Sequence, residues 1–212
     1  MTDVWSERLD AYVASDAHRE GADLDLLVEW AAGAETALDV ATGGGHVARR
    51  LREEGLAVVS CDAAPGMGPD VVCPADDLPF ADDAFDVVAC RTAAHHFPAV
   101  PAALAEMTRV ARERVLLVDT VFMGDAVEEA ETLRDPSHVR NLGVEEWTAL
   151  VADAGLEPAE VVVLAHEMDF ASWLARTGCE GAEAERVEEL LADRVHEGRL
   201  TLDKVAIRGE VR

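Results

Sequence analysis

A short apolar run that ends in three consecutive glycines constrains the fold of this chain more than any other feature. Residues 36–41 (TALDVA) are typical of a buried strand, residues 42–45 (TGGG) of a turn, and residues 46–54 of a helix. Strand, glycine turn and helix in this order open a βαβ unit. Glycines in such a turn adopt positive φ and let a ligand approach the backbone. The feature predicts an α/β domain with a ligand site at this turn.

Strand and helix patterns keep alternating along the rest of the chain. Further strands are predicted at residues 56–61, 70–73, 84–90, 114–119, 159–165 and 202–209, and further helices at 99–111, 144–154 and 183–196. This alternation predicts a doubly wound, mostly parallel seven-stranded sheet with helices on both faces and a ligand at the carboxyl ends of the strands. The gap between the second and third strands is shorter than the dozen or so residues of a usual crossover, so we expect a turn there instead of a helix.

Length and charge narrow the class of protein. A chain of 212 residues fits one domain. Its 43 acidic and 18 basic residues give a net charge of −25, which repels phosphate backbones and excludes a nucleic-acid partner. The acidic excess fits either adaptation to a salt-rich cytoplasm or the codon bias of a GC-rich genome, and the sequence leaves both open.

Apolar runs and cysteines indicate the compartment. No run approaches the ~18–20 apolar residues of a membrane span, and residues 1–7 are acidic and polar where a secretion signal would be basic and then apolar. We therefore expect a cytoplasmic protein. The four cysteines, which show no CxxC spacing, are expected to be buried free thiols and not metal ligands. They are Cys61, Cys73, Cys90 and Cys179.

The residues around the glycines favour S-adenosylmethionine (SAM) over a dinucleotide. A dinucleotide fingerprint reads GxGxxG, but Ala48 stands at the third glycine position. Asp39, at the end of the strand, would repel a pyrophosphate and suits the cationic amino and sulfonium groups of SAM. Asp62, at the end of the second strand, can accept hydrogen bonds from both ribose hydroxyls. In residues 76–80 (DDLPF), either a carboxylate accepts a hydrogen bond from the adenine amino group or the segment is a plain polar turn.

Several of these motifs together resemble a known family. Residues 38–46 (LDVATGGGH), 76–80, 85–88 (FDVV) and 91–97 (RTAAHHF) are similar to motifs of the class I SAM-dependent methyltransferases of type 11, which include the ubiquinone/menaquinone C-methyltransferases. Ala41 stands where many members have glycine. The resemblance covers about residues 8–165 and weakens over residues 63–69, where the family usually has a whole helix.

The resemblance implies a single Rossmann-like methyltransferase domain that uses SAM and releases S-adenosylhomocysteine. Residues 1–30 would form a cap over the cofactor, residues 34–165 the SAM-binding core, and residues 166–212 a C-terminal helix and last strand. The glycine turn would hold the methionine part. The cofactor contacts expected are Asp39, Ala41, Thr42, Gly43, Gly45, Asp62, Ala63, Asp76, Asp77, Leu78 and Arg91.

Histidines supply the candidates for acid–base chemistry. Methyl transfer from a sulfonium is an in-line displacement, in which alignment alone reaches effective molarities of about 10⁵–10⁸ M, so a base is optional. Where one is needed, His is the usual choice. His95 and His96 follow the fourth strand, and Tyr12 and His18 lie in the expected cap; helix capping and packing are the alternative roles.

Two further histidines have weaker assignments. His46 opens the helix beside the glycines and is expected to contact the cofactor. His138 lies in residues 134–140, a segment that either shapes the substrate pocket or is a solvated connector.

The function expected is methylation of a small molecule by a monomer or homodimer. A module that binds SAM without transferring its methyl group is the alternative, and side chains of Phe122, Met123 or Trp173 would then plug the pocket. An NAD(P)-dependent oxidoreductase is disfavoured by Ala48 and by the lack of a Tyr-x-x-x-Lys pair, since Lys204 is the only lysine.

Overall fold

Eight strands form one sheet in the computed structural model, which describes Leu9, Val13 and residues 19–212. Their order is β3-β2-β1-β4-β5-β8-β6, with β7 paired to β8 alone. The strands are β1 (Thr36–Val40), β2 (Ala57–Asp62), β3 (Val71–Val72), β4 (Phe85–Arg91), β5 (Ala111–Thr120), β6 (Leu156–Asp169), β7 (Val195–His196) and β8 (Arg199–Val211). The first five are parallel, and β8 runs antiparallel to β5 and β6. The predicted doubly wound sheet is confirmed, with the two-residue β7 as an eighth strand.

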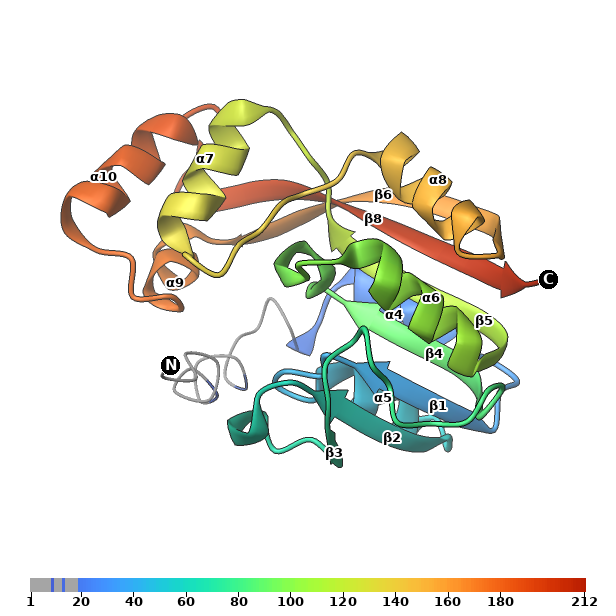
Figure 1. The fold of residues 1–212 in the computed structure, drawn as a ribbon. Coiled ribbons are helices and arrows are strands. Elements are labelled where there is room, and N and C mark those ends of the chain that lie inside the picture. Colours follow the sequence, from blue (N-terminus) through green and yellow to red (C-terminus); the bar gives the residue numbers. More distant parts are fainter. Residues whose placement is uncertain (1–8, 10–12, 14–18) are drawn as a thin grey trace.

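Helices cover both faces of the sheet (Figure 1). They are α4 (Ala22–Trp30), α5 (His46–Glu53), α6 (Val100–Val110), α7 (Asp125–Arg134), α8 (Val144–Asp153), α9 (Phe170–Ala175) and α10 (Gly181–Leu190). Leu24 and Leu27 of α4 and Leu51 of α5 bury one face of the sheet, whereas α6 and α8 bury the other through residues such as Leu104 and Trp147. Apolar residues at helical spacing produce these faces.

The connection between β2 and β3 is shortened, as predicted. It contains only the 3₁₀ turn η1 (Pro65–Met67). One oxygen of Asp70, Oδ2, accepts hydrogen bonds from the backbone nitrogen and hydroxyl of Ser60 and from Arg52, each at 2.8 Å. This carboxylate ties the start of β3 to β2 without a crossover helix.

The C-terminal part of the chain departs from the prediction. Strands β6 and β8 continue past the end of β5, because Thr120 pairs with Lys204 while β8 begins five residues earlier, at Arg199. Helices α7, α9 and α10 pack on these extensions (Figure 1). We call the three helices, β7 and the extensions the C-terminal lobe. Its core contains Val127, Ala130, Met168, Phe170, Trp173, Cys179, Val187, Leu191, Leu200 and Leu202.

The predicted helix over residues 183–196 is wrong at its end. Helix α10 stops at Leu190, and β7 forms a hairpin with β8. Glu197 and Gly198, with φ of 52° and 75°, make the turn, because two successive residues at positive φ give the type of turn that joins antiparallel strands.

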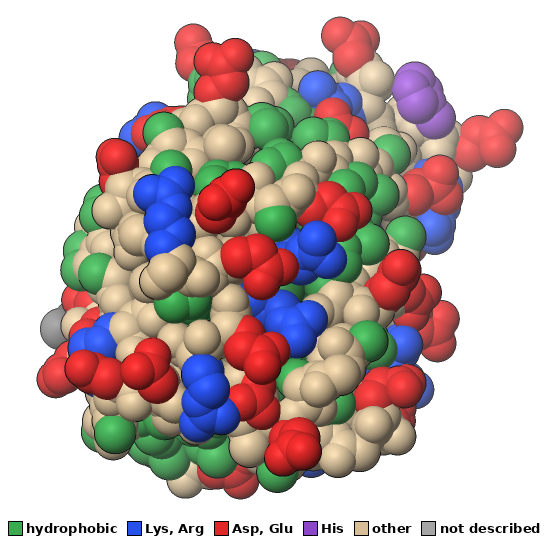
Figure 2. All heavy atoms as spheres, turned by 90° about the vertical axis from the view of Figure 1, so that its right-hand side faces the viewer, with side chains coloured by type: hydrophobic (Ala, Val, Ile, Leu, Met, Phe, Trp, Pro, Cys, Tyr) green, Lys and Arg blue, Asp and Glu red, His purple; other side chains and the backbone are tan. Residues whose placement is uncertain are grey.

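The surface and the thiols agree with the expectations from composition. Acidic side chains are scattered with arginines over the face in Figure 2. In the part of the chain that the structure describes, no helix has the length and apolarity to cross a membrane. All four cysteines are buried free thiols, as predicted.

Candidate functional site

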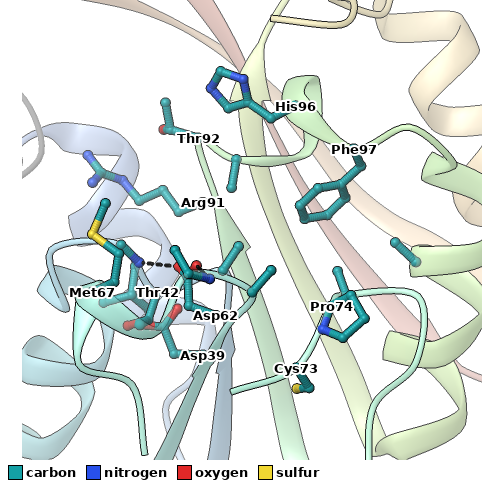
Figure 3. A pocket seen from close by; sticks show the side chains of 18 of the residues that line it. Asp39, Thr42, Asp62, Met67, Cys73, Pro74, Arg91, Thr92, His96 and Phe97 are labelled. Carbon is teal, nitrogen blue, oxygen red and sulfur yellow. Dashed lines mark hydrogen bonds between the residues drawn. The ribbon is translucent and has the colours of Figure 1, made fainter. Parts of the chain in front are cut away.

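A cavity of about 330 Å³ lies at the carboxyl ends of β1, β2 and β4 (Figure 3). Its volume is at the lower end of the range of about 300–1,000 Å³ that is usual for small-molecule sites. The strand order reverses between β1 and β4, which is where open α/β sheets bind ligands. The residues that line it include Asp39, Ala41, Thr42, Gly43, His46, Asp62, Ala63, Met67, Pro74, Asp76, Arg91, Thr92, His96, Phe97 and Ala99.

The glycine turn presents bare backbone to this cavity. Gly43 and Gly45 have φ of 50° and 74°, values that glycine adopts without strain. A Cβ atom added at either glycine would meet no other heavy atom of the described residues within 4 Å. Packing therefore does not require these glycines, and the space beside Gly43, which lines the cavity, is available to a ligand. Ala41 also has a positive φ, 54°, so the turn already holds one strained residue.

Asp39 is a buried carboxyl beside the first turn of α5. Its Oδ2 accepts from the Thr42 hydroxyl at 2.5 Å and from the backbone nitrogen of Ala48 at 3.0 Å. Burial raises the pKa of Asp39 to about 6, although these two donors act to lower it; the nearby Asp62 adds to the increase. A cationic ligand in the cavity would favour the ionised form of this carboxyl.

Asp62 is held by the backbone on both oxygens. Oδ2 accepts from Gly43 N and Oδ1 from Ala64 N, each at 2.9 Å. A carboxylate oxygen can accept two hydrogen bonds, so each oxygen retains one acceptor site. Asp62 lines the cavity, where this arrangement fits a pair of neighbouring hydroxyl groups.

The wall opposite Asp62 differs in part from the sequence expectation. The segment after β3 contributes Pro74, Ala75 and Asp76 to the cavity, but neither Asp77 nor Leu78 lines it, and Gly45 does not either. Leu78 is buried in the core, and its backbone nitrogen donates to Glu106 Oε2 at 2.9 Å. Sequence reasoning also missed Phe97 as part of the wall, although it ends the RTAAHHF motif.

A buried ion-pair cluster lies next to the cavity. Arg91 donates to both oxygens of Asp23, from Nε at 2.8 Å and Nη2 at 3.1 Å, and Lys204 Nζ donates to Asp23 Oδ2 at 3.0 Å. Burial acts to raise the pKa of Asp23, but Lys204 and Arg91 hold it well below its usual range. Burial lowers the pKa of Lys204 to about 8. The ion pairs of Asp23 could not be predicted from the sequence, because Arg91 and Lys204 lie far from it along the chain.

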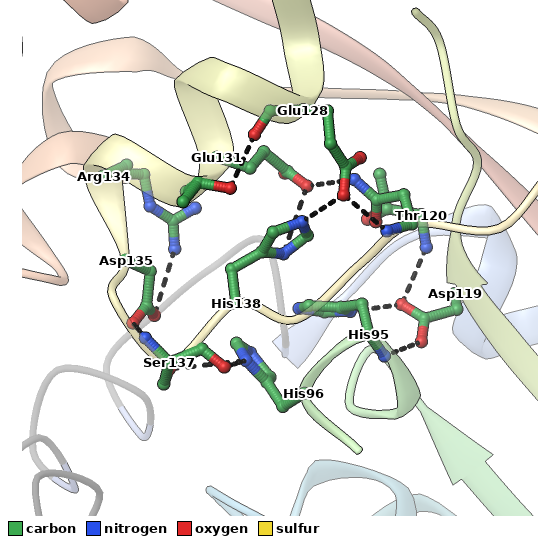
Figure 4. A network of polar contacts seen from close by, with 12 residues as sticks. His95, His96, Asp119, Thr120, Glu128, Glu131, Arg134, Asp135, Ser137 and His138 are labelled. Carbon is green, nitrogen blue, oxygen red and sulfur yellow. Dashed lines mark hydrogen bonds and ion pairs between the residues drawn. The ribbon is translucent and has the colours of Figure 1, made fainter. Parts of the chain in front are cut away.

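His95 and Asp119 form a hydrogen-bonded pair at the carboxyl edge of the sheet (Figure 4). His95 Nδ1 lies 2.5 Å from Asp119 Oδ1, and the backbone nitrogen of His95 donates to Asp119 Oδ2 at 2.8 Å. Although burial acts to lower it, Asp119 raises the pKa of His95. The pair has the geometry of a histidine oriented by a carboxylate.

His96 has the opposite electrostatic environment. Its Nδ1 lies 3.1 Å from the carbonyl oxygen of Ser137. Burial and the neighbouring His95 lower the pKa of His96 to about 3. This imidazole is therefore neutral near pH 7, and a carbonyl partner requires that Nδ1 carries its proton.

A second, smaller cavity of about 50 Å³ adjoins the first. Thr92 and His96 line both cavities, and Thr92 has a positive φ of 54°. The small cavity lies between the sheet and the C-terminal lobe. Its other lining residues are His95, Thr120, Glu131, Arg134, His166, Met168, Trp173, Arg176, Leu202 and Lys204.

The remaining candidates do not line the large cavity or lie outside the described residues. Tyr12 and His18 lie outside the described residues. His138 is buried in the polar network of Figure 4, with Nε2 2.9 Å from Glu128 Oε1, and lines neither cavity. Phe122 and Met123 also line neither cavity, while Trp173 lines only the small cavity. None of the three side chains expected to plug a binding module enters the large cavity.

Comparison with known proteins gives the family. A family model described as a methyltransferase domain (Methyltransf_11) matches residues 38–118. The chain is 30% identical over 216 aligned residues to YcgJ of Bacillus subtilis (strain 168), named an uncharacterized methyltransferase, with 91% of this chain and 84% of that protein covered. The chain belongs to this methyltransferase family. It is a SAM-dependent methyltransferase, as the resemblance implied.

Two further comparisons place this methyltransferase among its relatives. It is 38% identical over 98 residues to the demethylmenaquinone methyltransferase of Beutenbergia cavernae, an alignment that covers 42% of this chain and 41% of that enzyme. The crystal structure of YcgJ has a TM-score of 0.77 at 27% identity, covering 90% of this chain and 98% of that one. The predicted class I methyltransferase fold is confirmed.

A more distant structure has the same fold. Geranyl diphosphate C-methyltransferase from Streptomyces coelicolor A3(2), solved with S-adenosyl-L-homocysteine, has a TM-score of 0.66 at 14% identity over 90% of this methyltransferase and 79% of that chain. At this identity the likeness concerns the fold alone.

Proposed function

We propose that the methyltransferase binds SAM in the large cavity and transfers its methyl group to a small molecule whose reacting end enters the small cavity. The observation that carries the proposal is the pairing of a bare glycine turn with Asp62, whose two oxygens each keep an acceptor site beside it. A nucleoside with a flexible, cationic tail matches both features.

Each part of SAM has a chemically suitable group of residues in the wall of the large cavity. The glycine turn and the buried Asp39 suit the methionine end, because bare backbone allows close approach and the carboxylate balances positive charge. Asp62 suits the ribose hydroxyls. Pro74, Asp76 and Phe97 line the remaining wall and suit the adenine ring, with Asp76 as an acceptor for its amino group.

The methyl group is then expected to face Thr92 and His96, the residues common to both cavities. When bound, SAM would supply a methyl group on a sulfonium for in-line transfer to the acceptor, with S-adenosylhomocysteine as the leaving product. The residues around this junction hold the acceptor in line and exclude water.

His95 is the residue best suited to remove a proton from the acceptor. It lines the small cavity, its Nδ1 is engaged with Asp119, and Nε2 is the ring nitrogen that takes up a proton. Asp119 stabilises the imidazolium that results. His96, with its pKa near 3, is a neutral wall residue beside the transferred methyl group.

Isothermal titration calorimetry tests the proposal. S-adenosylhomocysteine should bind with a Kd on the order of micromolar. Asp62→Ala removes two hydrogen bonds to a charged acceptor, so affinity should fall at least about 30-fold. Gly43→Val adds a branched side chain at positive φ beside the cavity and should also abolish binding.

The matched control is Asp82→Ala. Asp82 is exposed, its Oδ1 lies 2.8 Å from Arg109 Nη1, and it does not line the cavity. This variant should bind like the wild type. Absence of binding to the wild-type protein, or equal affinities for the Asp62→Ala variant and the wild type, would contradict the proposal.

A further inference from the structure

The small cavity gathers basic side chains in a strongly acidic protein. Among the described residues that line it are three cations, Arg134, Arg176 and Lys204, and one carboxylate, Glu131. Over the whole chain acidic residues outnumber basic ones by 43 to 18. The local excess of positive charge therefore runs against the composition of the protein, and it indicates a site for a negatively charged group.

The carboxylate in the cavity is already engaged. Glu131 Oε2 accepts from the Asn141 amide at 2.5 Å and lies 3.9 Å from His138 Nδ1. It therefore faces partners from the segment after α7. Neutralisation of the cations by Glu131 is limited by these contacts.

Arg134 has unused hydrogen-bonding capacity. Its side chain is only 10% exposed, its guanidinium lies 4.2 Å from the centre of the Trp173 ring, and the nearest Asp135 oxygen is 4.0 Å away. Its Nε has no hydrogen-bond partner among the described residues. A buried donor without an acceptor is unfavourable, so an anionic ligand in the cavity would relieve this cost.

Lys204, which lines the small cavity, has one ammonium hydrogen without an acceptor among the described residues. Its ammonium donates to Asp23 Oδ2 at 3.0 Å and to Thr92 Oγ1 at 3.2 Å, and an ammonium has three hydrogens. His166, which lines the same cavity, is held neutral: burial and the nearby Lys204 lower its pKa to about 3. Because Thr92 also lines the large cavity, Lys204 lies beside the junction at which the methyl group is expected.

We propose that the small cavity binds a carboxylate of the methyl acceptor, so that the substrate is a small organic acid. A volume of about 50 Å³ has room for one such group, and planar carboxylates pair well with guanidinium groups. Met168, Trp173 and Leu202 give the cavity an apolar side, which suits the carbon atoms next to the carboxylate. This inference rests on the proposed function, because the acceptor must approach the methyl group held in the large cavity.

The single lysine makes a direct test possible. In protein labelled with ¹³C,¹⁵N-lysine, the side-chain NMR signals of lysine come from Lys204 alone. With S-adenosylhomocysteine present, sodium acetate should shift these signals in a saturable manner and raise the pKa of Lys204 above about 8, since a bound anion favours the ammonium form. Acetamide and sodium chloride at matched ionic strength should not.

Variants separate the cavity from the general surface charge. Arg134→Gln and Arg176→Gln should each weaken acetate binding at least tenfold, whereas Arg186→Gln, at an exposed arginine of α10 that pairs with Glu129, should leave it unchanged. Thermal unfolding of each variant checks that it is folded, and either arginine variant suffices for the test.

Two results would overturn the inference. One is a Lys204 signal that responds equally to acetate and acetamide, or to ionic strength alone. The other is a response to inorganic phosphate without any response to acetate. Calorimetry with S-adenosylhomocysteine on the same samples keeps the two proposals apart, because cofactor binding without an acetate response removes only the organic-acid acceptor.

Discussion

Two carboxyl groups in the large cavity differ in how they are held. Asp62 accepts from two backbone nitrogens, whereas Asp39 is almost wholly buried and has a pKa raised to about 6. A raised carboxyl pKa means that the folded protein holds a proton more tightly than the unfolded chain does. The contribution of Asp39 to stability is therefore present below about pH 4 and is lost as the pH rises through 6.

This shift predicts a pH-dependent affinity for SAM. Because the cationic cofactor favours ionised Asp39, binding near pH 5.5–6 should release a proton, and affinity should fall by up to about tenfold for each pH unit below the pKa. Calorimetry in two buffers of different ionisation enthalpy measures the proton release. Asp39→Asn keeps an acceptor for Thr42 and Ala48, so it should fold, bind SAM more weakly at pH 7 and lose the pH dependence. An unchanged wild-type affinity between pH 5 and 7 would argue against this role.

The His95–Asp119 pair gives a second prediction at the scale of single residues. Because Asp119 raises the pKa of His95, the stabilisation from this pair is fully present below about pH 6.5 and declines as the pH rises through the folded-state pKa. Histidine side-chain NMR, with His95→Gln for assignment, should show that Asp119→Asn lowers the pKa of His95. His96 should stay neutral from pH 5 to 8 in both proteins. A His95 titration unaffected by Asp119→Asn would show that the pair is not coupled.

At the scale of elements, regular patterns made the core predictable. The strands from residues 36 to 119, the glycine turn and helices α6 and α8 follow apolar runs and helical spacing, and the short gap before β3 correctly indicated a missing helix. Local signals were weaker in the C-terminal lobe. Helix α10 ends at Leu190, inside the stretch of residues 183–196 that has helical composition. Strands β6 and β8 extend where only the lobe covers them.

Within the site, too, the sequence predicts some residues and not others. Asp39, Asp62 and the glycines could be found because they sit at strand ends within short motifs. The contacts of Asp23 with Lys204 and of Arg134 with Trp173 could not be predicted, because they join segments that are far apart in the sequence. Leu78 lies in a recognisable motif, but its side chain packs in the core and does not line the cavity.

The shortened connection before β3 predicts that Asp70 supports the cavity wall. Asp70→Ala removes two hydrogen bonds from Ser60 of β2 and one from Arg52 of α5. It should lower the free energy of unfolding by about 1–2 kcal/mol. It should also weaken S-adenosylhomocysteine binding, because Pro74 and Asp76 follow β3 directly. Asp25→Ala, which breaks an exposed ion pair with Arg50, is the control for urea unfolding and calorimetry. Equal effects of the two substitutions would show that the tie is unimportant.

At the scale of the whole molecule, a net charge of −25 produces self-repulsion that salt screens. The midpoint of thermal unfolding should therefore rise by several degrees between about 0.05 and 0.5 M NaCl, a range over which the Debye length falls from ~14 to ~4 Å. Sorbitol of equal osmolality controls for general exclusion effects and should give a smaller increase. A midpoint independent of salt would mean that the many local ion pairs already balance the charge.

The position of the cofactor is the claim on which the other proposals depend. A crystal structure of the protein with S-adenosylhomocysteine tests it most directly. Both ribose hydroxyls should lie about 2.5–3.0 Å from the oxygens of Asp62, with the homocysteine tail along the glycine turn and its sulfur facing Thr92 and His96. A nucleoside bound elsewhere, or in the large cavity with its sugar away from Asp62, would contradict it.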